Sequence, residues 1–182
     1  LHHAAWGGHH NIVDTLLAYT PPVIEGGSVV GPSVVKTTLT AVDSSVVDNG
    51  GQSALHLAAE RASVNVLEKL LDKRANVNAR CKDGQTVLHR AAWGGSCEVV
   101  RLLRRSGADP FIRDNQEKKP WHIAAEKGHE TIAVELLREE ESVYEERIMD
   151  QKGLIFAAKM GYTSIARCLL EKDAEATVKD ND

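Results

Sequence analysis

A leucine-alanine segment recurs along this chain at a fixed step of 33 residues. Leu88 begins the copy LHRAA, and the residues one step before and after it, Leu55 and Trp121, begin LHLAA and WHIAA. A further step reaches Leu154, and a first copy starts at Leu1, one period plus 21 residues before Leu55. Such a period indicates a chain of stacked structural units, each too small to form a core alone.

A second column of apolar residues supports this register. The units close on leucines that keep the spacing: Leu16 and Leu17, Leu70 and Leu71, Leu103, Leu136 and Leu137, and Leu169 and Leu170. A period of 33 with an LHxAA core is the signature of ankyrin repeats, and the chain resembles that family over essentially its whole length. The resemblance implies an all-α repeat solenoid, in which helix-turn-helix units are joined by β-hairpins or loops.

The residues of the third copy explain why such a unit folds. The pair Asp83-Gly84 suits a tight turn, because glycine accepts a positive φ at no steric cost. Thr86 can then cap a helix that begins at Val87. The paired alanines of HRAA let a second helix pack closely, and glycines end both helices. One unit cannot bury its own apolar face, whereas stacked neighbours can.

The register divides the chain into six segments. They are a partial repeat at residues 1–17, an insertion at 18–47 and four further repeats at 48–79, 80–112, 113–146 and 147–182, which together form one ankyrin-repeat domain over residues 1–182. The first segment lacks its hairpin, and residues 174–182 match the stretch that opens a next repeat. We therefore expect the chain to be a piece of a longer array or an incomplete gene model.

The insertion at 18–47 interrupts the period with a sequence rich in Val, Thr, Ser, Gly and Pro. Added length between one repeat and the next costs little free energy. Three interpretations remain open at the level of sequence: a loop, a short Val-rich hairpin that docks on the first repeat or on a partner, or an intron read as coding sequence.

Three positions depart from the family pattern. Ala62 and Arg74 stand where glycines usually end the helices, and Glu117 replaces the usual turn glycine. We expect strained or differently shaped turns at the first two, and an irregular hairpin between the fourth and fifth repeats.

Catalytic and metal-binding patterns are absent from the sequence. The stretch HETIA begins like the zinc motif HExxH, but Ala133 occupies the position of the second histidine. There is no phosphate-binding loop, no dinucleotide fingerprint and no spaced set of Cys and His for zinc. The sequence therefore predicts no enzyme, no cofactor and no bound metal.

Four of the eight histidines share one repeat position, and the resemblance implies a structural role for them. They are His2, His56, His89 and His122. In the ankyrin family this histidine hydrogen-bonds backbone and neighbouring side chains, and so ties the hairpin to the helix.

Net charge and cysteine content limit the binding partners and the cellular compartment that we expect. The net charge of −4 gives no general attraction to nucleic acid or to anionic membranes, and no apolar run is long enough to cross a membrane. Cys81, Cys97 and Cys168 form neither a CxxC pair nor an even framework. We expect an intracellular protein, in the cytoplasm or the nucleus.

The resemblance implies partner binding through the concave face of the first helices and through the hairpin tips. The residues that fall there are Trp6, Arg61, Trp93, Glu126, Lys127, Lys159 and Met160 after the alanine pairs, and Arg80, Lys82, Arg113 and Asn115 at the hairpins. Tryptophan and arginine are enriched at binding hot spots. Alternatively, Trp6 and Trp93 pack on the first helix of the next repeat.

These observations favour a non-catalytic protein-protein interaction module, or scaffold, that binds another protein. The alternative is a targeting or sensing segment of a larger multidomain enzyme or signalling receptor. Binding of nucleic acid by the array is a third hypothesis, against which the net charge argues. Self-association through uncapped repeat ends is also expected, because an end that no repeat covers exposes an apolar stacking face.

Overall fold

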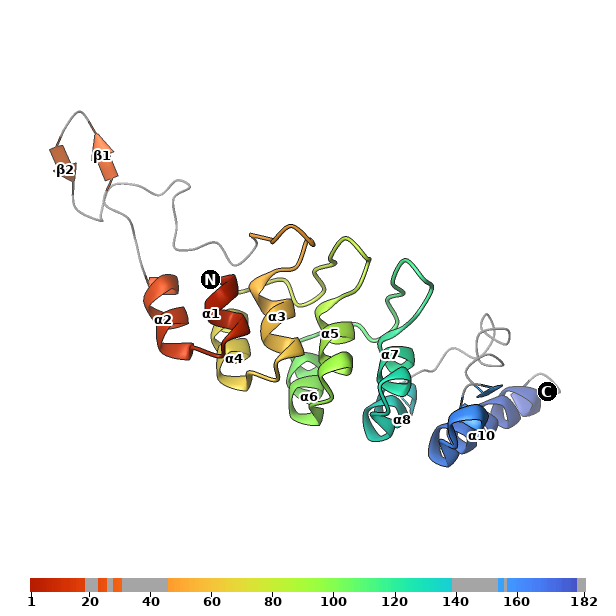
Figure 1. The fold of residues 1–182 in the computed structure, drawn as a ribbon. Helices are drawn as coiled ribbons and strands as arrows, with labels where there is room; N and C mark the ends of the chain where they lie inside the picture. Colours follow the sequence, from red (N-terminus) through yellow and green to blue (C-terminus); the bar gives the residue numbers. More distant parts are fainter. Residues whose placement is uncertain (19–22, 26–27, 31–45, 139–153, 156, 180–182) are drawn as a thin grey trace.

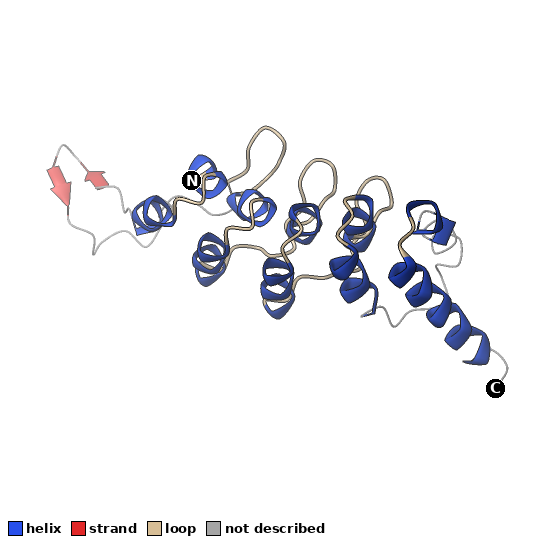
Figure 2. Cartoon of the chain, turned by 60° about the horizontal axis from the view of Figure 1, so that its bottom comes forward, coloured by secondary structure: helices blue, strands red, loops and turns tan. Residues whose placement is uncertain are grey.

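The chain is an all-α repeat solenoid in a computed structural model, which describes residues 1–18, 23–25, 28–30, 46–138, 154–155 and 157–179. Its helices lie in two rows (Figures 1 and 2). One row holds α1 (His2–Trp6), α3 (Ala54–Glu60), α5 (Val87–Gly94) and α7 (Pro120–Glu126), and the other holds α2 (His10–Ala18), α4 (Val64–Asp72), α6 (Cys97–Arg105), α8 (Glu130–Arg138) and α10 (Thr163–Lys179). Within each row, successive helices pack against one another, from α1 to α7 in the first row and from α2 to α10 in the second.

The first helices of three repeats begin in the same way. Ser53, Thr86 and Lys119 are extended N-cap residues. The backbone N–H of each donates to Nδ1 of the histidine three residues later, at 3.2, 3.0 and 3.1 Å. This side chain reaches back to the cap as the acidic residue of a capping box does. The helix start expected at Val87 is confirmed.

Close approach of neighbouring helices depends on small residues. The alanine pairs of α3, α5 and α7 are buried, within one apolar core that extends along the array. At the end of α5, a Cβ added to Gly94 would lie 2.4 Å from the carbonyl oxygen of Glu60 on α3. Glycine is therefore required there, because any side chain would force the two helices apart.

The left-handed turn conformation recurs in three repeat columns. It follows the first helix at Gly8, Ala62, Gly95, Gly128 and Gly161, follows the second helix at Arg74 and Gly107, and occupies the hairpin tip at Gly51, Gly84 and Glu117. The three non-glycine residues adopt φ values of 55°, 59° and 61°. Their turns keep the glycine shape and carry strain, because Cβ is crowded in this region. The expected irregular hairpin falls at residues 139–153, outside the described part of the chain.

Part of the insertion forms a two-stranded antiparallel hairpin. Strand β1 (Val23–Glu25) pairs with β2 (Ser28–Val30), with Val23 opposite Val30. The other residues from 19 to 45 lie outside the described part of the chain, so docking of this hairpin stays a prediction.

The last helix differs from the sequence expectation. Residues 174–179 were expected to open a next hairpin, but they continue α10, which is 17 residues long. Asp173 occupies the position that Gly107 holds after α6, and alanine and glutamate follow it. Without the glycine that supplies a left-handed cap, these good helix formers extend the helix.

None of the described helices is both long and apolar enough to cross a membrane. Within the described ranges, no group of three His, Cys, Asp or Glu side chains could hold a metal ion. The three cysteines form no disulfides.

Candidate functional site

Two tryptophan rings each lie against a cation of the next repeat. The guanidinium carbon of Arg61 lies 3.6 Å from the Trp6 ring centroid, and the ammonium nitrogen of Lys127 lies 3.1 Å from that of Trp93. Trp6 is the last residue of α1 and Trp93 the last but one of α5, and each cation is the C-cap of the first helix of the following repeat. The face of an indole attracts a cation through its quadrupole, so the pairs join neighbouring repeats.

Both tryptophans also remain open to solvent. Trp6 is 39% exposed and Trp93 is 43% exposed, whereas Trp121 is buried in the core. Packing on the next repeat, the alternative role of these rings, therefore covers only part of each tryptophan side chain. The remainder of each ring is available to a ligand.

Glutamates occupy the tryptophan position in the second and fourth repeats, and each is paired. An oxygen of Glu60 lies 3.3 Å from Nη1 of Arg90, and an oxygen of Glu126 lies 2.6 Å from Nζ of Lys118. These contacts neutralise the carboxylates. In the third repeat, Gly94 stands at the position that Arg61 and Lys127 hold in the second and fourth. The close approach to Glu60 leaves no room for a side chain there.

Hydrogen bonds join the hairpin tips of neighbouring repeats. The N–H of Lys82 donates to the carbonyl of Gly50 at 3.0 Å, and that of Asn115 donates to the carbonyl of Asp83 at 3.0 Å. The Asn115 amide also donates to the Lys82 carbonyl at 2.9 Å. These bonds limit independent movement of the tips, so they form one surface.

The two arginines expected at the hairpins reach backbone carbonyls. Nη2 of Arg80 donates to the carbonyl of Arg113 at 2.9 Å, and Nη1 of Arg113 donates to that of Glu117 at 2.9 Å. Both arginine side chains therefore use some of their N–H donors to stabilise the hairpin loops. The Lys82 side chain is exposed at the same edge.

The shared histidines hold each helix to the following hairpin, as the resemblance implied. Nε2 of His2, His56 and His89 lies 3.0, 3.3 and 3.0 Å from the carbonyl oxygens of Gln52, Gln85 and Lys118. In His56 and His89, Nδ1 accepts the N–H of the helix cap, so Nε2 must carry the proton that is donated. The neutral imidazole makes both bonds.

Burial lowers the pKa of these histidines. The pKa of His56 falls to about 4 and that of His122 to about 3, because desolvation disfavours the imidazolium, and burial lowers the pKa of His89 as well. Nε2 of His122 is buried without a partner among the described residues. The carbonyl at the equivalent offset belongs to residue 151, which lies outside them.

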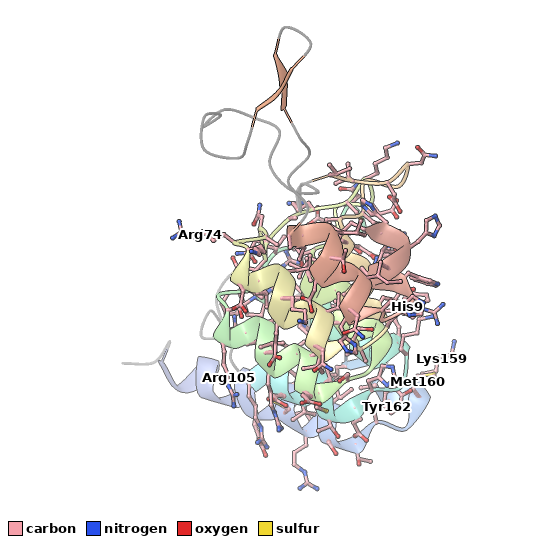
Figure 3. All side chains as sticks on the ribbon, turned by 90° about the vertical axis from the view of Figure 1, so that its left-hand side faces the viewer. His9, Arg74, Arg105, Lys159, Met160 and Tyr162 are labelled. Carbon is pink, nitrogen blue, oxygen red and sulfur yellow. The ribbon has the colours of Figure 1, made fainter. Side chains whose placement is uncertain are left out.

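Lys159 and Met160 are exposed and helical, just before the turn at Gly161 in the last repeat. Figure 3 shows them with His9, at the corresponding turn of the first repeat, on one side of the array. Arg74 and Arg105, at the ends of second helices, lie on the opposite side. The turns between first and second helices therefore lie on one side of the array, and the ends of the second helices lie on the other.

Sequence reasoning did not predict the partners of Arg90, Lys118 and His129. Arg90 pairs with Glu60, Lys118 with Glu126, and Nε2 of His129 lies 3.2 Å from the carbonyl oxygen of Trp93. A signal existed for Arg90, because the equivalent positions in the neighbouring repeats are apolar. A charged residue in an apolar column indicates a specific partner.

Known sequences match this architecture. A family model described as ankyrin repeats in three copies matches residues 1–114 and again residues 106–180. The chain belongs to the ankyrin-repeat family. It is 36% identical over 140 residues to the ankyrin repeat and KH domain-containing protein mask-1 of Caenorhabditis elegans, and 37% identical over 134 residues to an ankyrin repeat and KH domain-containing protein of Caenorhabditis briggsae.

The aligned regions are 74% and 71% of this ankyrin chain, but they span only 5% of each relative. The likeness therefore concerns the array and not the rest of those proteins. Ankyrin repeats generally mediate protein-protein interaction.

Proposed function

We propose that this ankyrin array is a non-catalytic module that binds another protein through one continuous surface. The surface, named here the tryptophan face, consists of Trp6, Arg61, Trp93, Lys127, Lys159 and Met160, with Glu126 beside them and the hairpin residues Arg80, Lys82, Arg113 and Asn115 at its edge. With its three reduced cysteines, the protein is expected in the cytoplasm or the nucleus.

The observation that carries the proposal is the repeated tryptophan-cation pair. Trp6 and Trp93 are large aromatic side chains, and each is held by a cation while about two fifths of it stays exposed. An aromatic anchor that is already fixed loses little conformational entropy when a partner binds. Exposed aromatics of this kind dominate the energetics of protein interfaces.

The backbone beneath supports the same conclusion. Hydrogen bonds between hairpin tips and from the shared histidines link the first four repeats to one another. A surface built on such a scaffold presents its side chains in one arrangement, as a recognition site requires.

The test is affinity capture from an extract of cells that express the chain, followed by binding of the purified partner. Wild type is compared with Trp93→Ala/Lys127→Glu and with Arg105→Glu, an exposed change on the opposite side (Figure 3). Circular dichroism first establishes that all three are equally folded. We expect one protein to be retained by wild type and Arg105→Glu and lost by the double variant, with the same order of affinities for the purified partner.

Equal retention by all three proteins would place the binding site elsewhere. Retention of no specific protein would contradict the proposed function.

A second candidate is suggested by the length of the relatives. Because the alignment spans 5% of each, the array could serve as the targeting or sensing part of a larger multidomain protein. Sequencing the full-length transcript tests this: a catalytic or receptor domain in the same reading frame would support it, and a transcript that encodes only ankyrin repeats would contradict it.

A further inference from the structure

The tryptophan face presents cations whose charge the protein leaves unpaired. Arg61 and Lys127 are exposed, and neither has a carboxylate within ion-pair distance among the described residues. The nearby carboxylates of Glu60 and Glu126 are already occupied by Arg90 and Lys118. The charge that remains for a ligand along this row is therefore positive.

Each cation retains hydrogen-bond donors that its ring does not satisfy. A guanidinium carries five N–H donors and an ammonium three, and an indole face attracts the charge without satisfying those donors as an oxygen would. A carboxylate of a partner can bind there and leave the tryptophan contact in place. The exposed remainder of the ring offers apolar surface beside the charge.

This local charge contrasts with that of the whole protein. The chain carries a net charge of −4, so it has no general attraction for an acidic partner, and local cations such as those of this row must supply the attraction. Local cations of this kind can orient an approaching acidic ligand.

We propose that the tryptophan face recognises an extended acidic segment of a partner protein. Two of its carboxylates pair with Arg61 and Lys127, and apolar side chains between or beside them contact Trp6 and Trp93. This inference rests on the proposed function and adds the chemistry of the partner.

The arrangement favours spaced carboxylates over the continuous phosphates of a nucleic acid. Nucleic-acid binding relies on many Lys and Arg contacts along the backbone. Here the two cations are separated by two repeats, and Glu60 and Glu126 lie beside them. A protein segment can place acidic residues at the cations and neutral residues at the glutamates.

The test begins with selection of short random peptides displayed on phage against the full chain. We expect the selected peptides to be enriched in Asp and Glu together with apolar residues. Affinities of the synthesised peptides are then measured by fluorescence anisotropy, with a single-stranded oligothymidylate of similar length as the nucleic-acid probe.

Two variants with the same change in net charge locate the site. Arg61→Glu/Lys127→Glu reverses the tryptophan-face cations, and Lys73→Glu/Arg105→Glu reverses exposed cations at the ends of α4 and α6. We expect the first variant to weaken acidic peptides by about tenfold or more and the second to leave them nearly unchanged. Added salt should weaken the wild-type complex.

The outcomes separate this inference from the proposed function. If the selected peptides are neutral or basic, and the Trp93→Ala variant no longer binds them, the partner is not acidic. That result would overturn this inference and leave the proposed function standing. Tighter binding of the oligothymidylate, or equal weakening by both charge variants, would also overturn the inference. Selection of no peptide would count against both.

Discussion

Lys127 places its ammonium nitrogen 3.1 Å from the centroid of the Trp93 ring in the preceding repeat. Arg61 and Trp6 repeat this relationship at the other end of the array. The two pairs connect adjacent repeats on the proposed binding surface. Each can therefore affect both stability and recognition, and the following measurements separate these effects.

A double-mutant cycle measures the energy of the pair itself. We expect Trp93→Ala and Lys127→Ala to show a coupling free energy of about 0.5–1 kcal/mol, as exposed cation–π pairs do. Urea unfolding of wild type, both single variants and the double variant gives this value. Trp6→Ala with Lys127→Ala is the control and should be additive, because these residues belong to different pairs. Additivity in the Trp93 cycle would show that the contact contributes nothing to stability.

Substitution of Gly94 tests the close approach of α5 and α3. Gly94→Ala should lower the free energy of unfolding by about 1–3 kcal/mol, because its Cβ would lie 2.4 Å from the backbone oxygen of Glu60. Gly7→Ala is the matched control at the same repeat position. Its Cβ would meet only the exposed His9 ring within 3 Å, and that ring can turn away. Equal effects in thermal or urea unfolding would contradict the packing argument.

Arg74 and Gly107 hold the same left-handed turn position after the second helix, so substitutions at the two positions should have opposite effects on stability. Arg74→Gly should raise the stability by a few tenths to about 1 kcal/mol, since relief of left-handed strain exceeds the entropy that glycine costs in the unfolded chain. Gly107→Ala should lower it by about 1 kcal/mol through strain alone, because no atom lies within 4 Å of the added Cβ. Unfolding midpoints report both. A destabilised Arg74→Gly variant would show that the arginine side chain stabilises its turn.

Buried histidines predict loss of stability in mild acid. The folded-state pKa of His56 is about 4, below the ordinary value of 6.5, so its contribution is complete above pH 6.5 and is lost as the pH falls towards 4. At about pH 5 the loss from His56 alone is on the order of 2 kcal/mol. Burial lowers the pKa values of His89 and His122 in the same direction.

Urea midpoints at neutral and mildly acidic pH check this expectation. The midpoint of wild type should fall on acidification, and the fall should be smaller in His56→Asn. His10→Gln, at an exposed position, should behave as wild type. A wild-type midpoint that is independent of pH over this range would rule out the proposed histidine linkage.

The sequence by itself determined the repeat fold. Periodicity placed the first helices, and the Thr86 cap and the helix start at Val87 follow from local capping chemistry. The resemblance to the ankyrin family implied the role of the shared histidines, and in the structure their capping bonds recur with the period. The helix starts and their caps depend on residues near one another in the chain.

Only the tertiary structure decided which side chains meet between repeats. Trp93 contacts Lys127 across 34 positions, one more than the period, and this offset depends on how neighbouring helices are displaced. The requirement for Gly94 and the pairing of Arg90 with Glu60 have the same origin. The continuation of α10 was missed because a lost glycine cap changes a local choice between helix and turn. Periodicity specifies the unit, whereas the separation and displacement of stacked units set the contacts that form the candidate surface.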